Sequence, residues 1–251
     1  MLPFYAPEKI WRFYTPVAHY LSRETSITWK LKLYYDYDSV INGICSNEIS
    51  LAYLGPISFG IAYEKCKPHP LAVSLGSDGK PFYRSIIFTN DFHLNSVKEL
   101  KGKTFAFGDG DSTSSNAVPK KMLAEEGVSL GSISPLFFKS HEKVVDAVVS
   151  NRAVAGATKL SVFEMVKGLR LKALKASQPL PHHTFCSAPG TPLSIEKKIA
   201  AALLKLKPRR NSADKITVSE WDPDLRYGLT APPYDYVSET KKMLEIHTRY
   251  R

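Results

Sequence analysis

A run of hydroxyl-bearing residues follows a glycine-rich turn and is the segment of the chain richest in binding chemistry. The strand-like residues 103–107 end in Gly-Asp-Gly at 108–110, and a helix is expected to begin soon afterwards. The first N–H groups of a helix have no partner inside it and lie at the positive end of its dipole. Such a helix start can bind an anion. The hydroxyl residues at this point are Ser112, Thr113, Ser114 and Ser115.

One hydroxyl residue would be enough to cap this helix, so four in succession favour binding of an oxyanion. The segment is not a Walker A loop, which needs Gly-Lys followed by Ser or Thr. It is not a G-x-G-x-x-G loop either, because Thr113 stands where the third glycine would follow Gly108 and Gly110. Nucleotide binding is therefore disfavoured.

Three further side chains are candidates for the same site. Tyr53 is expected at the C-terminal end of a strand, the edge where α/β proteins bind ligands, and Tyr83 lies near an expected crossing between two lobes. Tyrosines pack well in cores, and the chain has 13 of them, so packing is the more common role for each. His141 directly precedes a predicted helix, where a lone histidine is more often a cap or a surface residue.

Enzyme, metal and nucleic-acid functions have weaker support. Ser114, His141 and Asp109 could be imagined as a nucleophile, a base and an orienting group, but no G-x-S-x-G elbow accompanies them. Adjacent His182 and His183 would alternate direction in an extended segment and rarely chelate one ion without distant partners. The basic residues are dispersed, with no nucleic-acid-binding signature. We expect no catalysis, no cofactor, no metal and no nucleic-acid partner.

Composition sets the class of the chain. The 251 residues are 43% hydrophobic and 23% charged, which is ordinary globular composition and excludes collagen-like, disordered and coiled-coil classes. No run approaches the roughly 18 apolar residues of a membrane-spanning helix. The formal net charge of +10 favours anionic ligands through long-range steering. The three widely spaced cysteines indicate no disulfide framework or zinc site, although one bridge with one free thiol remains open.

Strand-like runs alternate with helix-periodic segments from end to end, which predicts an α/β architecture with mostly parallel sheets. In the first part we expect a helix over 7–24, a strand over 27–35, a helix over 37–45, a strand over 49–54 and a helix from 56. Asp78-Gly79 predicts a hairpin turn into a strand over 82–89. A second set follows, with strands over 103–107, 134–138 and 153–157 and helices over 113–127 and 141–150. We expect two lobes with a cleft between them.

A set of short motifs occurs in the same order as in one known family. The chain resembles the PhnD-like proteins, the phosphonate- and phosphite-binding substrate-binding proteins of ABC transporters, from about residue 2 to about residue 244. The motifs are Tyr53-Leu-Gly-Pro56, Phe82-Tyr-Arg-Ser85, Leu100-Lys-Gly-Lys103, Ser112-Thr-Ser114 with Pro119, Ser140-His-Glu-Lys-Val144 and Pro181-His-His183.

The resemblance implies the fold of a type 2 periplasmic binding protein: two α/β lobes, a two-strand hinge and a central ligand cleft. We place lobe I at 1–87 plus 186–251 and lobe II at 88–185. By resemblance, the phosphoryl oxygens are held by Ser112, Thr113 and Ser114. Donors from the other lobe and the hinge are Tyr53 and Tyr83, and His141 points at the ligand.

The function implied is capture of a small phosphorus oxyanion (a phosphonate, phosphite or phosphate) for the permease of an ABC importer. The alternative is the ligand-sensing domain of a membrane signalling receptor. We expect an extracytoplasmic monomer, either free in the periplasm or lipid-anchored, whose secretory signal is absent from this sequence. Ser161 and His183 stand where the family's aminoalkylphosphonate binders carry acidic residues, so an amino-phosphonate ligand is disfavoured.

Overall fold

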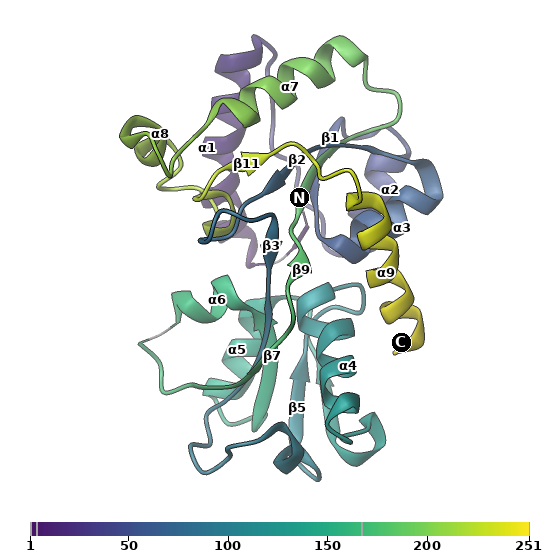
Figure 1. The fold of residues 1–251 in the computed structure, drawn as a ribbon, viewed down its shortest axis with the longest axis vertical. Coiled ribbons are helices and arrows are strands. Elements are labelled where there is room, and N and C mark those ends of the chain that lie inside the picture. The colour runs from purple at the N-terminus through teal and green to yellow at the C-terminus, as the bar shows by residue number, and fades with distance from the viewer. Residues whose placement is uncertain (1, 4, 167, 251) are drawn as a thin grey trace. The chain divides into compact units, whose positions relative to one another are not determined.

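The computed structural model describes residues 2–250 except 4 and 167, and it divides into two compact units (Figure 1). Unit 1 comprises Met1–Phe82 and Pro181–Lys241, and unit 2 comprises Tyr83–Leu180 and Lys242–Arg251. The chain therefore passes from one unit to the other three times. The lobe boundaries expected from the sequence, 1–87 with 186–251 and 88–185, stay a prediction.

Unit 1 is built on a four-stranded sheet in the order β1-β10-β2-β11. Its neighbours all pair antiparallel, as Tyr53 opposite Phe185 and Val73 opposite Thr230 illustrate. The expectation of mostly parallel pairing is wrong here, because β10 returns from late in the chain and inserts between two strands that would otherwise be neighbours. The strands are β1 (Leu51–Leu54), β10 (Thr184–Ser187), β2 (His69–Ser74) and β11 (Leu229–Thr230).

The helices of unit 1 begin at residues suited to helix starts. Asp36 caps α2 by accepting the N–H of Ser39 at 2.8 Å, and Pro56 stands in the first turn of α3, where a missing N–H costs nothing. A disulfide between Cys45 and Cys66 joins the ends of α2 and α3. The elements are α1 (Pro7–Thr25), α2 (Tyr37–Cys45), α3 (Pro56–Cys66), α7 (Leu193–Lys205), α8 (Ser212–Thr217), η4 (Pro223–Leu225) and the start of α9 (Tyr236–Arg249).

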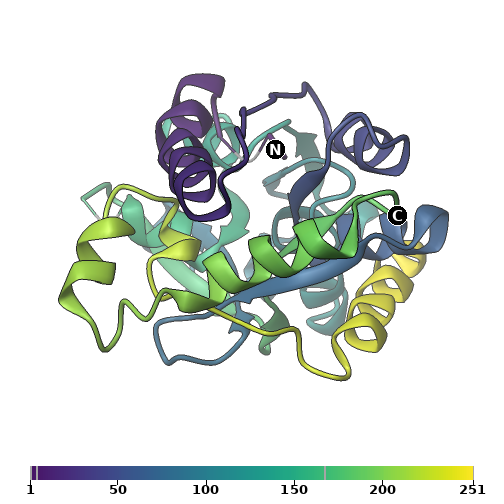
Figure 2. The same cartoon turned by 90° about the horizontal axis from the view of Figure 1, so that it is seen from above.

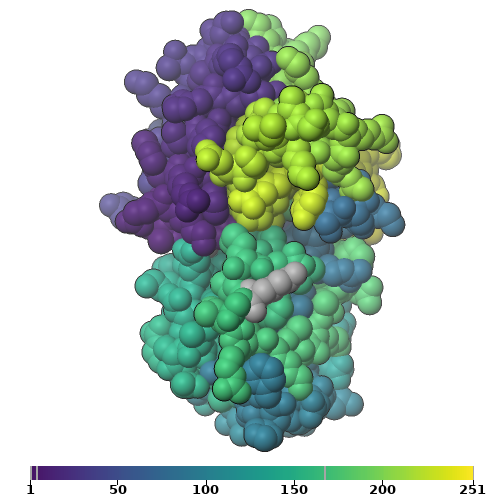
Figure 3. Space-filling model, turned by 90° about the vertical axis from the view of Figure 1, so that its left-hand side faces the viewer, coloured from purple at the N-terminus to yellow at the C-terminus, as the bar shows by residue number. Residues whose placement is uncertain are grey.

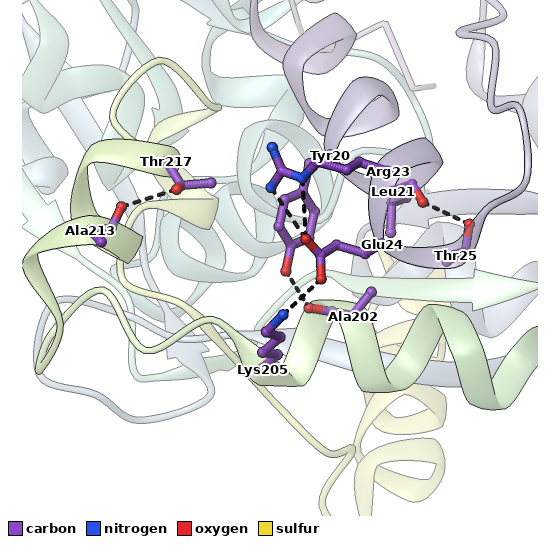
Figure 4. Close-up of polar contacts among 9 residues, drawn as sticks. All are labelled: Tyr20, Leu21, Arg23, Glu24, Thr25, Ala202, Lys205, Ala213 and Thr217. Atoms are coloured by element: carbon purple, nitrogen blue, oxygen red, sulfur yellow. Dashed lines mark hydrogen bonds and ion pairs between the residues drawn. The ribbon is translucent and has the colours of Figure 1, made fainter.

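Side-chain contacts hold α1 to the C-terminal part of unit 1. The Tyr20 hydroxyl donates to the Ala202 carbonyl at 2.7 Å, and Lys205 Nζ lies 2.9 Å from Glu24 Oε2 (Figure 4). The Tyr20 ring also meets the buried Trp221 edge-on, with centroids 5.3 Å apart. Figure 3 shows α1, in purple, beside the yellow-green segment that contains this tryptophan. The position of α1 in unit 1 is thus fixed near its C-terminal end.

Unit 2 has a five-stranded mixed sheet in the order β6-β5-β7-β4-β8. The β6-β5 and β5-β7 pairs are parallel, whereas β4 pairs antiparallel with β7 and β8. Phe105 and Phe107 of β5 and Ile87 of β4 are fully buried in its core. The strands are β4 (Ser85–Thr89), β5 (Thr104–Phe107), β6 (Ser134–Phe137), β7 (Ala155–Lys159) and β8 (Lys172–Ala176), and the helical elements are η1 (Val97–Leu100), η2 (Thr113–Ala117), α4 (Val118–Glu125), η3 (Leu130–Ser132), α5 (His141–Val149) and α6 (Leu160–Met165).

Two short strands lie at the points where the chain changes unit. Strands β3 (Phe82–Tyr83) and β9 (Leu180–Pro181) pair with each other in a separate two-stranded sheet. Next to them the His182 N–H donates to the Pro81 carbonyl at 2.9 Å. Within the described part of the chain, no helix combines the length and the apolar content needed to cross a bilayer.

Two local expectations are wrong. Residues 28–34 are not a strand, and Figure 2 shows them as part of an extended link from α1 to α2. Gly79, with φ of +79°, does make a turn, but the strands before and after it belong to different sheets, so no hairpin forms. In both cases the local pattern is present and the expected pairing partner is not, because strand pairing is decided by the rest of the fold.

Candidate anion-binding site

The hydroxyl-rich segment follows β5 and forms a widened helical turn. The Ala117 N–H donates to the Ser112 carbonyl at 3.1 Å, which makes η2 a π-helical turn that continues into α4. Pro119 explains the widening, because it has no N–H to offer the Ser115 carbonyl four residues earlier. That carbonyl instead accepts the Gly108 N–H at 2.8 Å. Such π-turns often mark functional sites.

Two of the four hydroxyls stabilise the turn itself. Ser112 Oγ accepts the Ser115 N–H at 3.3 Å, which is the cap that the sequence suggested as a minimal role. Ser115 Oγ donates to the Ala157 carbonyl of β7 at 2.6 Å. A Cβ on Gly108 would lie 2.4 Å from Ser115 Oγ, so only glycine allows this close approach. Thr113 and Ser114 lie between these two anchors and are also buried.

Strand β4 fixes the backbone of the same turn. Ser85 Oγ donates to the Ser114 carbonyl at 2.6 Å, and Ser85 itself pairs with Lys159 of β7. The turn is therefore anchored to two neighbouring strands. An anion at its N–H groups would meet donors that are already oriented, which reduces the ordering cost of binding.

His141 is held at the same edge of the unit 2 sheet. It is the first residue of α5, it is buried, and its Nδ1 lies 2.8 Å from the Thr158 hydroxyl on β7. Since Ala157 holds Ser115 and Thr158 holds His141, consecutive residues of β7 bring the starts of η2 and α5 to one strand end. This edge is where the C-terminal ends of the parallel strands β5 and β7 meet, as expected for a ligand site in an α/β sheet.

Sequence reasoning missed Lys159, the last residue of β7. Its side chain is fully buried, and it lies directly opposite Ser85 in the β4-β7 pair. A buried ammonium is costly unless its surroundings compensate the charge, so a fully buried lysine at this edge of the sheet is a candidate ligand residue. One signal was present in the sequence, because this lysine directly follows a strand-like run of small residues.

Two acidic residues directly precede the turn. Burial raises the pKa of Asp109, while the Asp111 N–H, which donates to its carboxylate, and the Lys139 ammonium at 3.6 Å oppose that rise. The second acidic side chain, Asp111, lies 3.2 Å from His247 Nε2. Each carboxylate thus has a basic group nearby, which weakens the repulsion that it would exert on an anion.

The two predicted tyrosines lie in different environments. Tyr83 is half-buried and packs against the core of unit 2. Tyr53 is fully buried in unit 1, where its hydroxyl lies 2.7 Å from Ser74 Oγ and its ring stacks on His183. Burial raises the pKa of Tyr53 well above the ordinary value, so this phenol is a neutral donor at physiological pH. Ser112, Thr113, Ser114 and His141 are brought together in unit 2, and ligand contacts of all six residues stay predictions.

Unit 1 contains one further cluster of buried polar side chains. One ligand-type atom each of His182, His183 and Asp224 lie within 4.8 Å of one another. The third partner, Asp224, is in η4, far from the histidine pair in sequence, and was not foreseen. Nδ1 of His182 accepts the N–H of His183 at 2.8 Å, so one ring nitrogen of that residue already has a backbone partner. The second ring nitrogen of His182, a ring nitrogen of His183 and a carboxylate oxygen of Asp224 are ligand types that bind zinc.

Comparison with known proteins places the chain in a family. The fold is that of the type 2 periplasmic binding proteins. PhnD1 of Prochlorococcus marinus, solved with methylphosphonate, superposes with a TM-score of 0.86 at 18% identity, covering 99% of this chain and 95% of the other. The chain belongs to the family of phosphonate periplasmic substrate-binding proteins of ABC transporters, whose sequence profile matches residues 1–223.

Two curated relatives cover part of the chain. The phosphate-import protein PhnD of Mycolicibacterium smegmatis is 30% identical over 155 residues, 57% of this chain and 48% of that protein. The phosphonates-binding periplasmic protein of Escherichia coli is 26% identical over 172 residues, 63% of this chain and 51% of that protein. The matched region thus spans about half the length of these relatives. The family resemblance expected from the motifs is confirmed.

Proposed function

We propose that this protein captures a small phosphorus oxyanion outside the cytoplasm and delivers it to the permease of an ABC importer, without catalysing a reaction. The observation that carries the proposal is the π-turn of buried hydroxyl residues after β5, anchored to β4 and β7 beside His141 and the buried Lys159. This arrangement combines oriented N–H and O–H donors with a cation, which suits a compact, multiply charged oxyanion.

Each residue of the proposed site has a role that follows from its donors. Thr113 and Ser114 present hydroxyls and backbone N–H groups at the start of η2, and Ser112 keeps a proton to donate although its oxygen accepts the cap bond. His141 supplies a ring nitrogen from the start of α5. Tyr53 and Tyr83 complete the set as phenol donors, with the two units acting as the lobes of the binding protein.

The ligand class rests on charge and on what relatives bind. One relative is named for phosphate import, and the structure from Prochlorococcus marinus holds methylphosphonate. Ser161 and His183, at positions where an ammonium group would need an acid, support a ligand without an amino group. We therefore propose phosphate, phosphite or a simple alkylphosphonate in preference to an aminoalkylphosphonate.

The disulfide supports an extracytoplasmic location. Cys45 and Cys66 are bonded, whereas Cys186 is a buried free thiol. Disulfides persist in oxidising compartments such as the bacterial periplasm and are rare in the cytosol. We propose a monomer that is free in the periplasm or carries a lipid anchor, with the permease as its protein partner.

A thermal-shift panel tests the proposal. Protein stripped of ligand by unfolding and refolding is mixed with phosphate, phosphite, methylphosphonate, 2-aminoethylphosphonate or sulfate. A ligand at about a thousand times its Kd adds roughly 4 kcal/mol of stability, which raises Tm by several degrees. We expect this shift with at least one of the first three and not with 2-aminoethylphosphonate. Equal shifts with all five would show only general anion binding, and no shift with any would refute the proposal.

A further inference from the structure

The second half of α9 belongs to unit 2. This unit includes the residues from Lys242 onward, and Met243 packs against its hydrophobic core. His247, about one turn further along the helix, is buried. Burying a polar ring costs free energy unless a hydrogen-bonding or charged group compensates it. The surroundings of this imidazole therefore indicate what the end of α9 does in unit 2.

The imidazole meets the loop that leads into the hydroxyl turn. His247 Nε2 lies 3.2 Å from Oδ1 of Asp111, the residue directly before Ser112. The backbone of this loop is fixed by Asp109, whose carboxylate accepts the Asp111 N–H at 3.1 Å and whose carbonyl accepts the Ser112 N–H at 2.9 Å. The position of the Asp111 backbone is thus set within the loop, while its side chain reaches α9.

The place of Asp111 in the chain makes its charge important for the proposed anion site. The N–H groups at a helix start attract a carboxylate of the protein for the same reasons that they attract an oxyanion ligand. Asp111 stands two residues before Thr113, the first residue of the turn that continues into α4. Its carboxylate can therefore compete with a ligand for these donors and repel it. Tight anion binding requires this carboxylate to be held elsewhere and its charge to be offset.

Burial distinguishes His247 from the cation beside the other acidic residue. Lys139 lies 3.6 Å from Asp109, but its side chain is 77% exposed, so water and salt screen its charge. The side chains of His247 and Asp111 are 7% and 17% exposed, so their interaction is screened less. A protonated imidazole offsets the carboxylate charge, and a neutral one can still offer it an N–H. Of these two basic groups, His247 is the better placed to control a carboxylate at the turn.

We propose that His247 is a positioning residue for oxyanion binding, which holds the Asp111 carboxylate at α9 and away from the N–H groups of η2. This inference rests on the function proposed above. It adds to the site a residue that follows residue 223, where the match to the family profile ends. The second half of α9 thereby becomes part of the anion site, although it is far from the hydroxyl turn in sequence.

Anion affinities of four proteins test this role. The wild type, His247→Ala, Asp111→Asn and the double variant are titrated by calorimetry with phosphate, phosphite and methylphosphonate. We expect His247→Ala to weaken binding about tenfold, because one carboxylate near the ligand is then neither held nor offset. Asp111→Asn should bind at least as tightly as the wild type. The double variant should regain the affinity of Asp111→Asn, since no carboxylate is left to be held.

This rescue separates a positioning role from a packing role. A double variant that binds as weakly as His247→Ala, or wild-type affinity in His247→Ala, would overturn the proposal. His93→Ala removes an exposed histidine of unit 2 and is the matched control, which should bind like the wild type. If His247→Ala does not fold, His247→Gln takes its place in the comparison, because glutamine retains a side-chain N–H without a charge.

A measurement without anion distinguishes failure of this inference from failure of the proposed function. Urea unfolding of the same four proteins measures the coupling between residues 247 and 111 in the free energy of unfolding. We expect the two single substitutions to be non-additive. Additive effects would overturn the contact whether or not an anion binds. Coupling in urea combined with no anion binding by the wild type would refute the proposed function and reduce the pair to a structural contact.

Discussion

At the scale of single residues, the hydroxyl cluster divides into residues with observed structural bonds and residues with a proposed binding role, a difference that residue type alone does not reveal. Ser115 has the same side chain as Ser114, yet its hydroxyl is bonded to β7, whereas Ser114 contributes its carbonyl to Ser85. The four hydroxyls therefore differ in what their removal should do. Variants at neighbouring positions can separate loss of stability from loss of binding.

We expect Thr113→Ala to weaken oxyanion binding by about 1–3 kcal/mol, because a ligand oxygen then loses a hydroxyl donor in a buried site. Titration calorimetry with the anion that shifts Tm measures this loss. Ser115→Ala is the matched control, since it removes the bond to Ala157 and should chiefly lower stability in urea unfolding. Unchanged affinity in Thr113→Ala would remove that residue from the site.

Lys159 allows a second test at this scale. Lys159→Met removes the buried ammonium at the end of β7 and should weaken binding of a doubly charged oxyanion about tenfold or more, the range for hydrogen bonds to charged groups. Lys159→Arg keeps the charge and is the control for altered packing. Affinities measured by calorimetry decide the matter, and equal losses in both variants would indicate a packing role without a direct charge effect.

At the scale of elements, the sequence predicts most helices well and strand pairing poorly. The helices expected over 7–24 and 37–45 match α1 and α2 to within a residue, because helix formation is decided largely by local spacing. The link at 28–34 has an equally regular pattern, but a strand also needs a neighbour. The late strand β10 could not be assigned to a place between β1 and β2 from any local signal.

Candidate site residues that lie together in one segment were predicted from the sequence. Those that join the cluster only through strand pairing or the fold of a unit were missed. Residues 112–114 at the start of the helix are contiguous in sequence, so their hydroxyl groups can be recognised as possible anion ligands without knowing the fold. Lys159 joins it only because β7 pairs with β4 opposite Ser85, and Asp224 meets His182 and His183 only through the fold of unit 1. The spacing of residues in the sequence does not reveal contacts between segments that are far apart in the chain.

The π-turn itself gives a prediction at this scale. Pro119→Ala restores an N–H that can donate to the Ser115 carbonyl, in competition with the bond from Gly108. We expect the turn to tighten toward an α-helix and oxyanion affinity to fall about tenfold, since the donors at 113–114 would shift. Chemical shifts of Gly108 and Ser115 report the change. Unchanged oxyanion affinity together with a changed chemical shift of the Gly108 amide would show that binding does not need the widened turn.

At the scale of the whole molecule, buried titratable groups of unit 1 make stability depend on pH. The hydroxyl turn, His141 and Lys159 belong to unit 2, whereas unit 1 contains the disulfide and a set of buried phenols. Burial is the main cause that raises the pKa values of Tyr5, Tyr14 and Tyr53 well above 10, and the negative charge of Asp222 adds to it. Because of these phenols, the free energy of unfolding is expected to depend on pH in the alkaline range.

The sign of that linkage follows from which state binds more protons. Above pH 10 the unfolded chain loses its phenol protons while the folded protein keeps them, so the free energy of unfolding falls as pH rises. Each such group contributes up to about 1.4 kcal/mol per pH unit, and the Tyr20 phenol and the Cys186 thiol, whose pKa values burial also raises, add to the contribution of these three. Urea unfolding followed by tryptophan fluorescence from pH 9 to about pH 11 measures this slope. Tyr53→Phe should reduce the slope by up to about 1.4 kcal/mol per pH unit, because one such proton is removed. A slope that is the same in both proteins would mean that Tyr53 ionises in the folded state, which its complete burial and its bond to Ser74 argue against.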